Sequence, residues 1–156
     1  RILLADKVAS RVAAARRLGF DAVNVEGDGQ NAVAAMLAAG DGLGVDRAAD
    51  CSGDPVAIRN AMLGCRRGGT VALQGIPEGT DTVAVPIHEI RRRELTIKNI
   101  RRCNVPLKRL IDIAMAGQVD LQSLVTHRFP LPEIGAAFNL VDRYADGVMK
   151  AVIVGA

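Results

Sequence analysis

The chain has 156 residues, of which 49% are hydrophobic and 3% aromatic, and its net charge is +3. This length suits one domain, or one domain and part of another, with the apolar content of an ordinary globular protein. No apolar run approaches the roughly 18 residues that a membrane-spanning helix needs, and no polybasic tail indicates nucleic acid as a partner. Three cysteines without a C-x-x-C pair argue against a zinc finger and favour a reducing compartment, the cytoplasm.

Short apolar segments alternate with segments of helical periodicity along most of the chain. Strands are expected at 1–6, 20–25, 46–51, 70–74, 94–100 and 148–154, and helices at 8–18, 30–39, 55–65, 87–93, 105–116 and 133–145. Arg66–Gly69 is predicted to be a turn, and 120–128 a loop with a short strand. The alternation predicts an α/β fold, in which a parallel sheet carries helices on both faces.

The first expected strand ends on an acid, Asp6. It lies at the carboxyl end of the strand, where open α/β sheets bind ligands, and an Asp there accepts hydrogen bonds from the adenosine ribose in dinucleotide-binding folds. The alternative is that Asp6 only caps the next helix. The glycine-rich turn G-x-G-x-x-G, which normally precedes such an acid by about 20 residues, is absent. We therefore expect either no dinucleotide binding or a piece of a longer chain.

Further motifs follow the acid-ended strand in a specific order. They are Leu18–Ala22, Val45–Gly53, Arg67–Gly75, Glu94–Lys98 and Leu124–Leu131. Together they resemble the medium-chain, zinc-type alcohol dehydrogenases over the whole chain, from the second strand of the nucleotide domain to the C-terminus. The stretch Ile100–Asn104 is similar to the F-R-Y-C-N of the sorbitol (polyol) dehydrogenase branch.

This resemblance implies two domains. Residues 1–101 would be a partial dinucleotide-binding (Rossmann) domain without its first strand, and residues 102–156 would return to a catalytic domain. The zinc ligands, the proton relay and the glycine-rich turn of the family would precede Arg1. No catalytic or metal-binding residue is therefore expected in this chain, which by itself would bind NAD weakly and be inactive.

The resemblance also assigns residues to the cofactor. Asp6 would hold the adenosine ribose and favour NAD, with Arg11 beside it, although Lys7 and Arg11 could instead attract a 2′-phosphate. The other expected cofactor-binding residues lie at or near the ends of later strands: Cys51, Ser52, Gly53, Gln74, Gly75, Ile76, Asn99, Ile100, Arg101 and Lys150. The first three would border adenine and ribose, Lys150 would reach the pyrophosphate, and the others would border the nicotinamide. Packing is the alternative for Cys51–Gly53, and simple exposure to solvent is the alternative for Arg11, Arg101 and Lys150.

The expected activity is NAD-dependent, zinc-containing oxidation of a secondary alcohol of a polyol, sugar or sugar acid to a ketone. Arg101 and Arg102 would face this small substrate, and Arg102 replaces the Tyr of polyol dehydrogenases. A second guanidinium favours an anionic substrate, unless the pair is merely a surface feature. The alternatives are a zinc-free quinone or enone reductase, or a non-catalytic nucleotide-binding module. The strand near 95–100 would form a homo-oligomer, a dimer or tetramer, without membrane or nucleic-acid partners.

Overall fold

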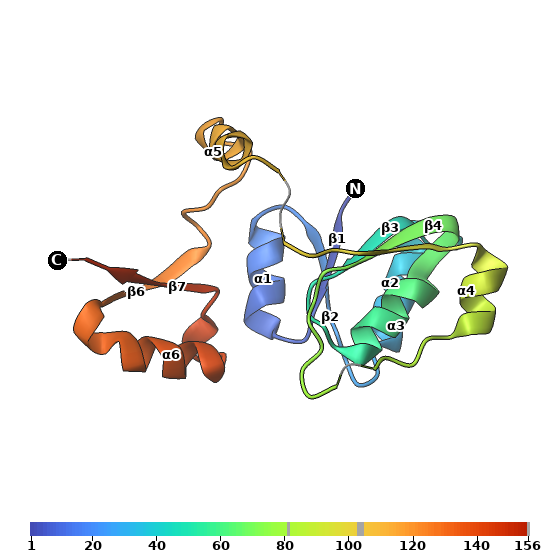
Figure 1. Cartoon of the computed structure of the whole chain (residues 1–156), viewed down its shortest axis with the longest axis horizontal. Coiled ribbons are helices and arrows are strands. Elements are labelled where there is room, and N and C mark those ends of the chain that lie inside the picture. Colours follow the sequence, from blue (N-terminus) through green and yellow to red (C-terminus); the bar gives the residue numbers. More distant parts are fainter. Residues whose placement is uncertain (81, 103–104, 156) are drawn as a thin grey trace. The chain divides into compact units, whose positions relative to one another are not determined.

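Strands and helices alternate through the first 102 residues (Figure 1). A computed structural model describes residues 1–80, 82–102 and 105–155. It divides into two compact units, Arg1–Arg102 and Cys103–Ala156. The elements of the first unit are β1 (Leu3–Asp6), α1 (Ala9–Arg17), β2 (Asp21–Asn24), α2 (Gln30–Ala39), β3 (Val45–Asp50), α3 (Pro55–Gly64), β4 (Cys65–Leu73), α4 (Ile87–Arg93) and β5 (Thr96–Asn99). The predicted α/β fold is confirmed.

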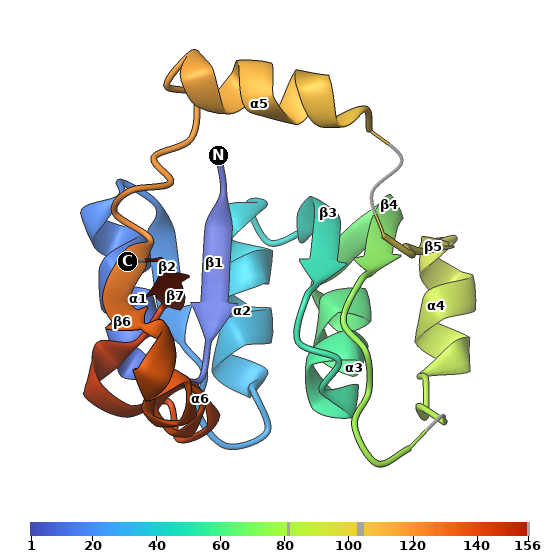
Figure 2. The same cartoon turned by 60° about the vertical axis from the view of Figure 1, so that its left-hand side comes forward.

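The strands of the first unit are parallel and form two sheets. β1 pairs with β2, so that Leu3 lies opposite Asp21. β4 lies between β3 and β5, with Thr70 opposite both Arg47 and Thr96. In the described part of the chain β1 and β3 do not pair with each other, and Figure 2 shows them as separate strands. This break is consistent with a sheet that lacks one strand.

Helices cover both faces of these strands, as predicted. Figure 1 shows α1 on one side of β1 and β2, with α2 and α3 on the other side. The buried residues of α1 include the small Ala14 and Ala15, which let the helix approach the strands closely. The main core forms from α3, α4 and β4, and its buried residues are Ile58, Ala61, Met62, Cys65, Val71 and Ile90.

The structure corrects the prediction for Arg66–Gly69. These residues belong to β4, which begins at Cys65 rather than at Thr70. The pairing is irregular here, because Val45 lies opposite Cys65 whereas Arg47 lies opposite Thr70. Gly68 has a φ of 69°, which a glycine adopts without strain. The glycines therefore form a bulge within a strand, and the sequence alone shows the same residues as a turn.

The second unit contains α5 (Leu107–Met115), β6 (Val125–Pro130), η1 (Leu131–Glu133), α6 (Ile134–Asp142), η2 (Ala145–Gly147) and β7 (Lys150–Val154). β6 and β7 form a parallel pair. In β6, the Nε2 atom of His127 lies 3.2 Å from Asp146 Oδ2, and its Nδ1 atom lies 2.9 Å from Thr126 Oγ1. These contacts link β6 to the short helix η2 before β7.

Candidate functional site

Three turns of the first unit meet at the carboxyl ends of β3, β4 and β5. The N–H groups of Gln74 and Gly75, after β4, both donate to the backbone oxygen of Asp50 at the end of β3, over 2.9 and 3.0 Å. The N–H of Ile100, after β5, donates to the oxygen of Leu73 over 2.8 Å. Parallel strands present their carboxyl ends at one edge, where α/β folds bind ligands. The structure thus brings together the residues predicted at the ends of β3, β4 and β5.

Asp6 ends β1, and its carboxylate organises the start of α1. Its Oδ1 accepts the N–H of Val8 over 2.8 Å, and its Oδ2 lies 3.8 Å from the Arg11 guanidinium. Val8 is the N-cap residue of α1, so Asp6 holds the turn before the helix, and its assignment as a helix cap stays a prediction. The side chain is 36% exposed, and a carboxylate can accept about four hydrogen bonds in all. Asp6 can therefore serve the helix and still accept ribose hydroxyls.

An ion pair connects the residue after Asp6 to the turn after β3. The ammonium of Lys7 donates to the carboxylate of Asp54, which also accepts the N–H of Val56 over 2.8 Å and so caps α3. The Lys7 ammonium, aided by the backbone N–H groups at the helix start, lowers the pKa of Asp54 below its ordinary value. Lys7 is thus engaged within the protein, which leaves it less suited to a 2′-phosphate.

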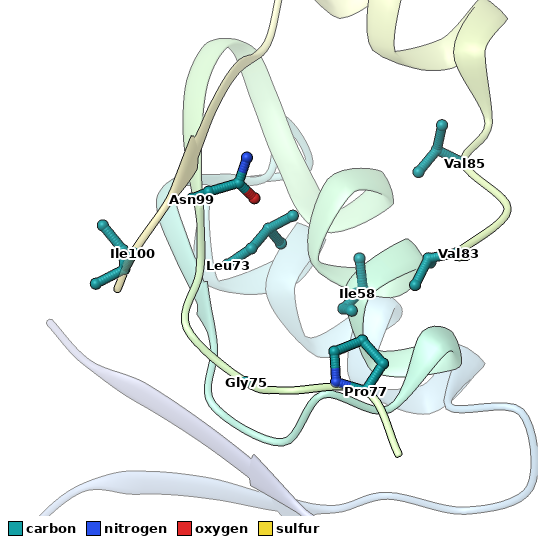
Figure 3. Close-up of a pocket in the computed structure, with 8 residues that line it drawn as sticks. All are labelled: Ile58, Leu73, Gly75, Pro77, Val83, Val85, Asn99 and Ile100. Carbon is teal, nitrogen blue, oxygen red and sulfur yellow. The ribbon is translucent and has the colours of Figure 1, made fainter. Parts of the chain in front are cut away.

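A pocket of about 390 Å³ opens beside the turns after β4 and β5. Three of its lining residues, Gly75, Asn99 and Ile100, are among those predicted to border the nicotinamide. Figure 3 shows the Asn99 amide directed toward the space between β5 and α3, with Ile58 and Val83 on the opposite side. The walls are mostly apolar with one amide group, which is the usual composition of a site for a flat organic ring.

Several predicted residues around this edge are exposed to solvent. Cys51, Ser52 and Gln74 are exposed, and the side chain of Ile76 is 82% exposed. Such an exposed isoleucine next to Gly75 is available to a ligand, which suits the expected position beside the nicotinamide. Arg101 and Arg102 are exposed too, and Arg102 has a φ of 58°, which non-glycine residues rarely adopt.

Lys150 is the predicted cofactor residue that belongs to the second unit. It is an exposed residue at the start of β7, in the second unit, and lies opposite Val125 of β6. The role of Lys150 at the pyrophosphate stays a prediction.

The sequence analysis missed one residue of the site, Asp50. It is 4% exposed, and its carboxylate accepts hydrogen bonds from Ser52 and Gly53, both predicted cofactor residues. A signal was present in the sequence, because Asp50 is an acid near the carboxyl end of an expected strand, as Asp6 is. Its burial, which decides its role, could not be seen there.

Zinc does not fit the described residues of this chain. Across residues 1–80, 82–102 and 105–155, no group of three or more His, Cys, Asp or Glu side chains could hold a metal ion. Cys103 lies outside the described residues.

The described helices also include none with the length and apolar character to cross a membrane.

The family is established by comparison with known sequences. The model of the zinc-binding dehydrogenase family matches residues 1–115, so the chain belongs to this family. It is 32% identical to the sorbitol dehydrogenase of Gallus gallus over 145 residues, which are 91% of this chain and 40% of that protein. It is 35% identical to a putative D-xylulose reductase of Rhizobium meliloti over 122 residues, 78% of this chain and 34% of the relative. The chain thus spans between about a third and two fifths of the length of these relatives.

Solved structures show the same fold. An oxidoreductase/dehydrogenase of unknown specificity from Escherichia coli matches all of this chain, and 44% of its own, with a TM-score of 0.88 and 25% identity. An alcohol dehydrogenase from Thermus sp. ATN1 matches all of this chain and 45% of its own, with a TM-score of 0.87 and 23% identity. The Rossmann-type fold predicted for the nucleotide domain is that of these dehydrogenases.

Proposed function

We propose that this chain is the cofactor-binding portion of an NAD-dependent, zinc-containing dehydrogenase that oxidises a secondary alcohol of a polyol, sugar or sugar acid to a ketone. The observation that carries the proposal is the gathering of predicted cofactor residues at one strand edge of a chain from the zinc-binding dehydrogenase family. The names of its sorbitol dehydrogenase and D-xylulose reductase relatives support the polyol substrate class.

In this proposal the chain binds and orients NAD, which accepts a hydride from the substrate when bound. Asp6 accepts the ribose hydroxyls with the acceptor capacity that Val8 and Arg11 leave over. Its negative charge, only partly offset by Arg11, disfavours the 2′-phosphate of NADP. The turn Cys51–Gly53 borders the adenosine, and Gln74–Ile76 and Asn99–Arg101 border the nicotinamide. The zinc ligands belong to a part of the protein other than the described residues, as do the groups that move the substrate proton.

Arg101 and Arg102 form the wall of the substrate site in this proposal. Two adjacent exposed guanidinium groups attract an anionic group through charge-assisted hydrogen bonds. Substitution Arg102→Tyr removes one of these charges and introduces the residue of polyol dehydrogenases. We expect it to lower kcat/KM for sugar acids about tenfold relative to polyols, which steady-state kinetics on both classes would measure. Equal losses on both classes would contradict a substrate role for Arg102.

We also propose a homo-oligomer that forms through β5. All four residues of β5 are exposed, and the strand pairs with β4 along one edge only in the described part of the chain. An unpaired edge can pair with the same strand of a second copy.

A cytoplasmic location is supported by two free thiols, Cys51 and Cys65, since a reducing compartment keeps cysteines unpaired.

The test uses the whole protein that contains this chain. Metal content, NAD and NADP binding, and turnover on a panel of polyols, sugars and sugar acids are measured on one preparation. The proposal expects stoichiometric zinc, tighter binding of NAD than of NADP, and turnover on a member of the panel. A metal-free protein that reduces quinones or enones would replace the proposal, and NAD binding without any turnover would reduce it to a nucleotide-binding module.

A further inference from the structure

Asp50 is a buried carboxylate for which the proposed function has no role so far. It is the last residue of β3 and is 4% exposed. Its Oδ1 accepts the N–H of Ser52 over 3.2 Å and the hydroxyl of Ser52 over 2.7 Å, and its Oδ2 accepts the N–H of Gly53 over 3.0 Å. Each oxygen thus faces a backbone N–H that cannot rotate away. The carboxylate holds the turn that follows β3.

The backbone of the same residue holds the turn that follows β4. The carbonyl oxygen of Asp50 accepts the N–H groups of Gln74 and Gly75, over 2.9 and 3.0 Å. One residue therefore anchors two turns that are more than twenty positions apart in the sequence. By the proposed function, the first turn borders the adenosine and the second borders the nicotinamide.

The two turns also interlock through their glycines. A Cβ placed on Gly75 would lie 1.9 Å from the nitrogen of Gly53 and 2.5 Å from Asp50 Oδ2. A Cβ placed on Gly53 would lie 2.2 Å from the backbone oxygen of Ile76. Both turns thus touch backbone to backbone, with no space for a side chain between them. A displacement of one turn must displace the other.

We propose that Asp50 is a positioning residue that makes the adenosine-side turn Cys51–Gly53 and the nicotinamide-side turn Gln74–Ile76 one rigid body. It contacts both turns and acts on the cofactor only through them. The identity of the ligand in this inference rests on the proposed function. The coupling of the two turns does not, because it follows from the contacts within the protein. The consequence is that damage to the adenosine side also misplaces the nicotinamide.

Substitution Asp50→Asn separates the hydrogen bonding from the shape of the side chain. In either orientation the amide group of asparagine points its N–H₂ at a backbone N–H, that of Ser52 or that of Gly53. One buried donor then loses its acceptor, which is destabilising even though the volume is unchanged. Asp46→Asn is the matched control, because Asp46 lies on the same strand at its other end, with an exposed side chain paired to Arg66.

The first readout is hydrogen–deuterium exchange of the two turns in the ligand-free whole protein, followed by mass spectrometry. We expect Asp50→Asn to speed exchange about tenfold in peptides covering 51–53 and 74–76, whereas Asp46→Asn changes neither. Faster exchange in 51–53 alone would overturn the inference. If Asp50→Asn fails to fold, Ser52→Ala removes the hydroxyl that donates to Asp50 and accepts the N–H of Asp54, and it is expected to speed exchange in both peptides by a smaller factor. An effect confined to 51–53 in that variant would overturn the inference as well.

The second readout is kinetic. Asp50→Asn is expected to raise the KM for NAD and also to lower kcat at saturating NAD, each by roughly tenfold, because both halves of the cofactor lose their position. A raised KM with unchanged kcat would show that Asp50 serves the adenosine side only, against the inference. A wild-type protein that binds no NAD would refute the proposed function instead, and the exchange readout would still decide whether Asp50 couples the turns.

Discussion

Asp6 and Asp50 show how the same sequence signal can lead to two different roles. Each acid is the last residue of a parallel strand, and each accepts a backbone N–H from two or three positions further on. The side chain of Asp6 is 36% exposed and has acceptor capacity left for a ligand. Asp50 is 4% exposed, and both of its oxygens are occupied by the next turn. Exposure, rather than residue type or position in the strand, separates a candidate ligand-binding acid from an internal anchor.

The largest effect is expected from Gly75→Ala, a substitution in one of the turns that the buried Asp50 holds. A Cβ would lie 1.9 Å from the nitrogen of Gly53, so one of two interlocked backbones must move. We expect a loss of about 3 kcal/mol in the free energy of unfolding, measured by urea denaturation. Gly135→Ala in α6 is the control, because no heavy atom lies within 4 Å of its Cβ position. Equal stability of the Gly75 variant and the wild type would refute the interlock.

The substitution Asp6→Asn tests whether the partly exposed carboxylate of Asp6 binds the cofactor. Asparagine keeps an oxygen that can accept the N–H of Val8, so the helix start and the stability should change little. The loss of the negative charge should weaken NAD binding about tenfold and raise the ratio of NADP to NAD affinity. Calorimetric titration of both nucleotides measures this. An unchanged preference would mean that Asp6 only caps the helix.

The smallest effect concerns Asp54, which lies in the turn after β3 and pairs with Lys7 next to Asp6. Its pKa is lowered from the ordinary value of 3.8 in the folded protein, first by Lys7 and then by backbone N–H groups. A lowered folded pKa means that this stability is present above the pKa of the unfolded chain and is lost as the pH falls through the folded pKa. Asp54→Asn retains a capping oxygen, so we expect a loss of about 0.5 kcal/mol at pH 7 that vanishes once the pH has fallen below the lowered folded pKa.

The matching variant Lys7→Gln distinguishes the origin of that pH dependence. If the ion pair is responsible, urea denaturation across pH 3–7 should give the same loss for Lys7→Gln as for Asp54→Asn. A full loss with Asp54→Asn and none with Lys7→Gln would assign the effect to the cap of α3 alone.

Much of the fold could be predicted because it depends on local patterns. Pro55 after Asp54 marks the start of α3, and the Asp54 side chain indeed accepts the N–H of Val56. The exception is Arg66–Gly69, where paired glycines are equally compatible with a turn and with a bulge, and only the pairing with β3 distinguishes them. The division of the strands into two sheets depends on which edges meet, which no local pattern encodes.

The candidate site could be predicted in part. Gly75 is predicted to border the nicotinamide, which stays a prediction, and the structure shows in addition that its backbone lies against that of Gly53. Asp50 was missed because its burial depends on the turn after β4, which no local pattern shows. Lys150 belongs to the second unit, and its role stays a prediction.

By itself, the sequence determined where the strands end, which acids and glycines stand at those ends, and which family the order of motifs resembles. Only the tertiary structure decided that the turns after β3 and β4 touch, and therefore that Asp50 is buried while Asp6 remains open to solvent. The physical reason is that burial depends on contacts between segments distant in the chain. The turn after β4, more than twenty residues beyond Asp50, is held by the same residue, whereas the carboxylate of Asp6 stays partly exposed.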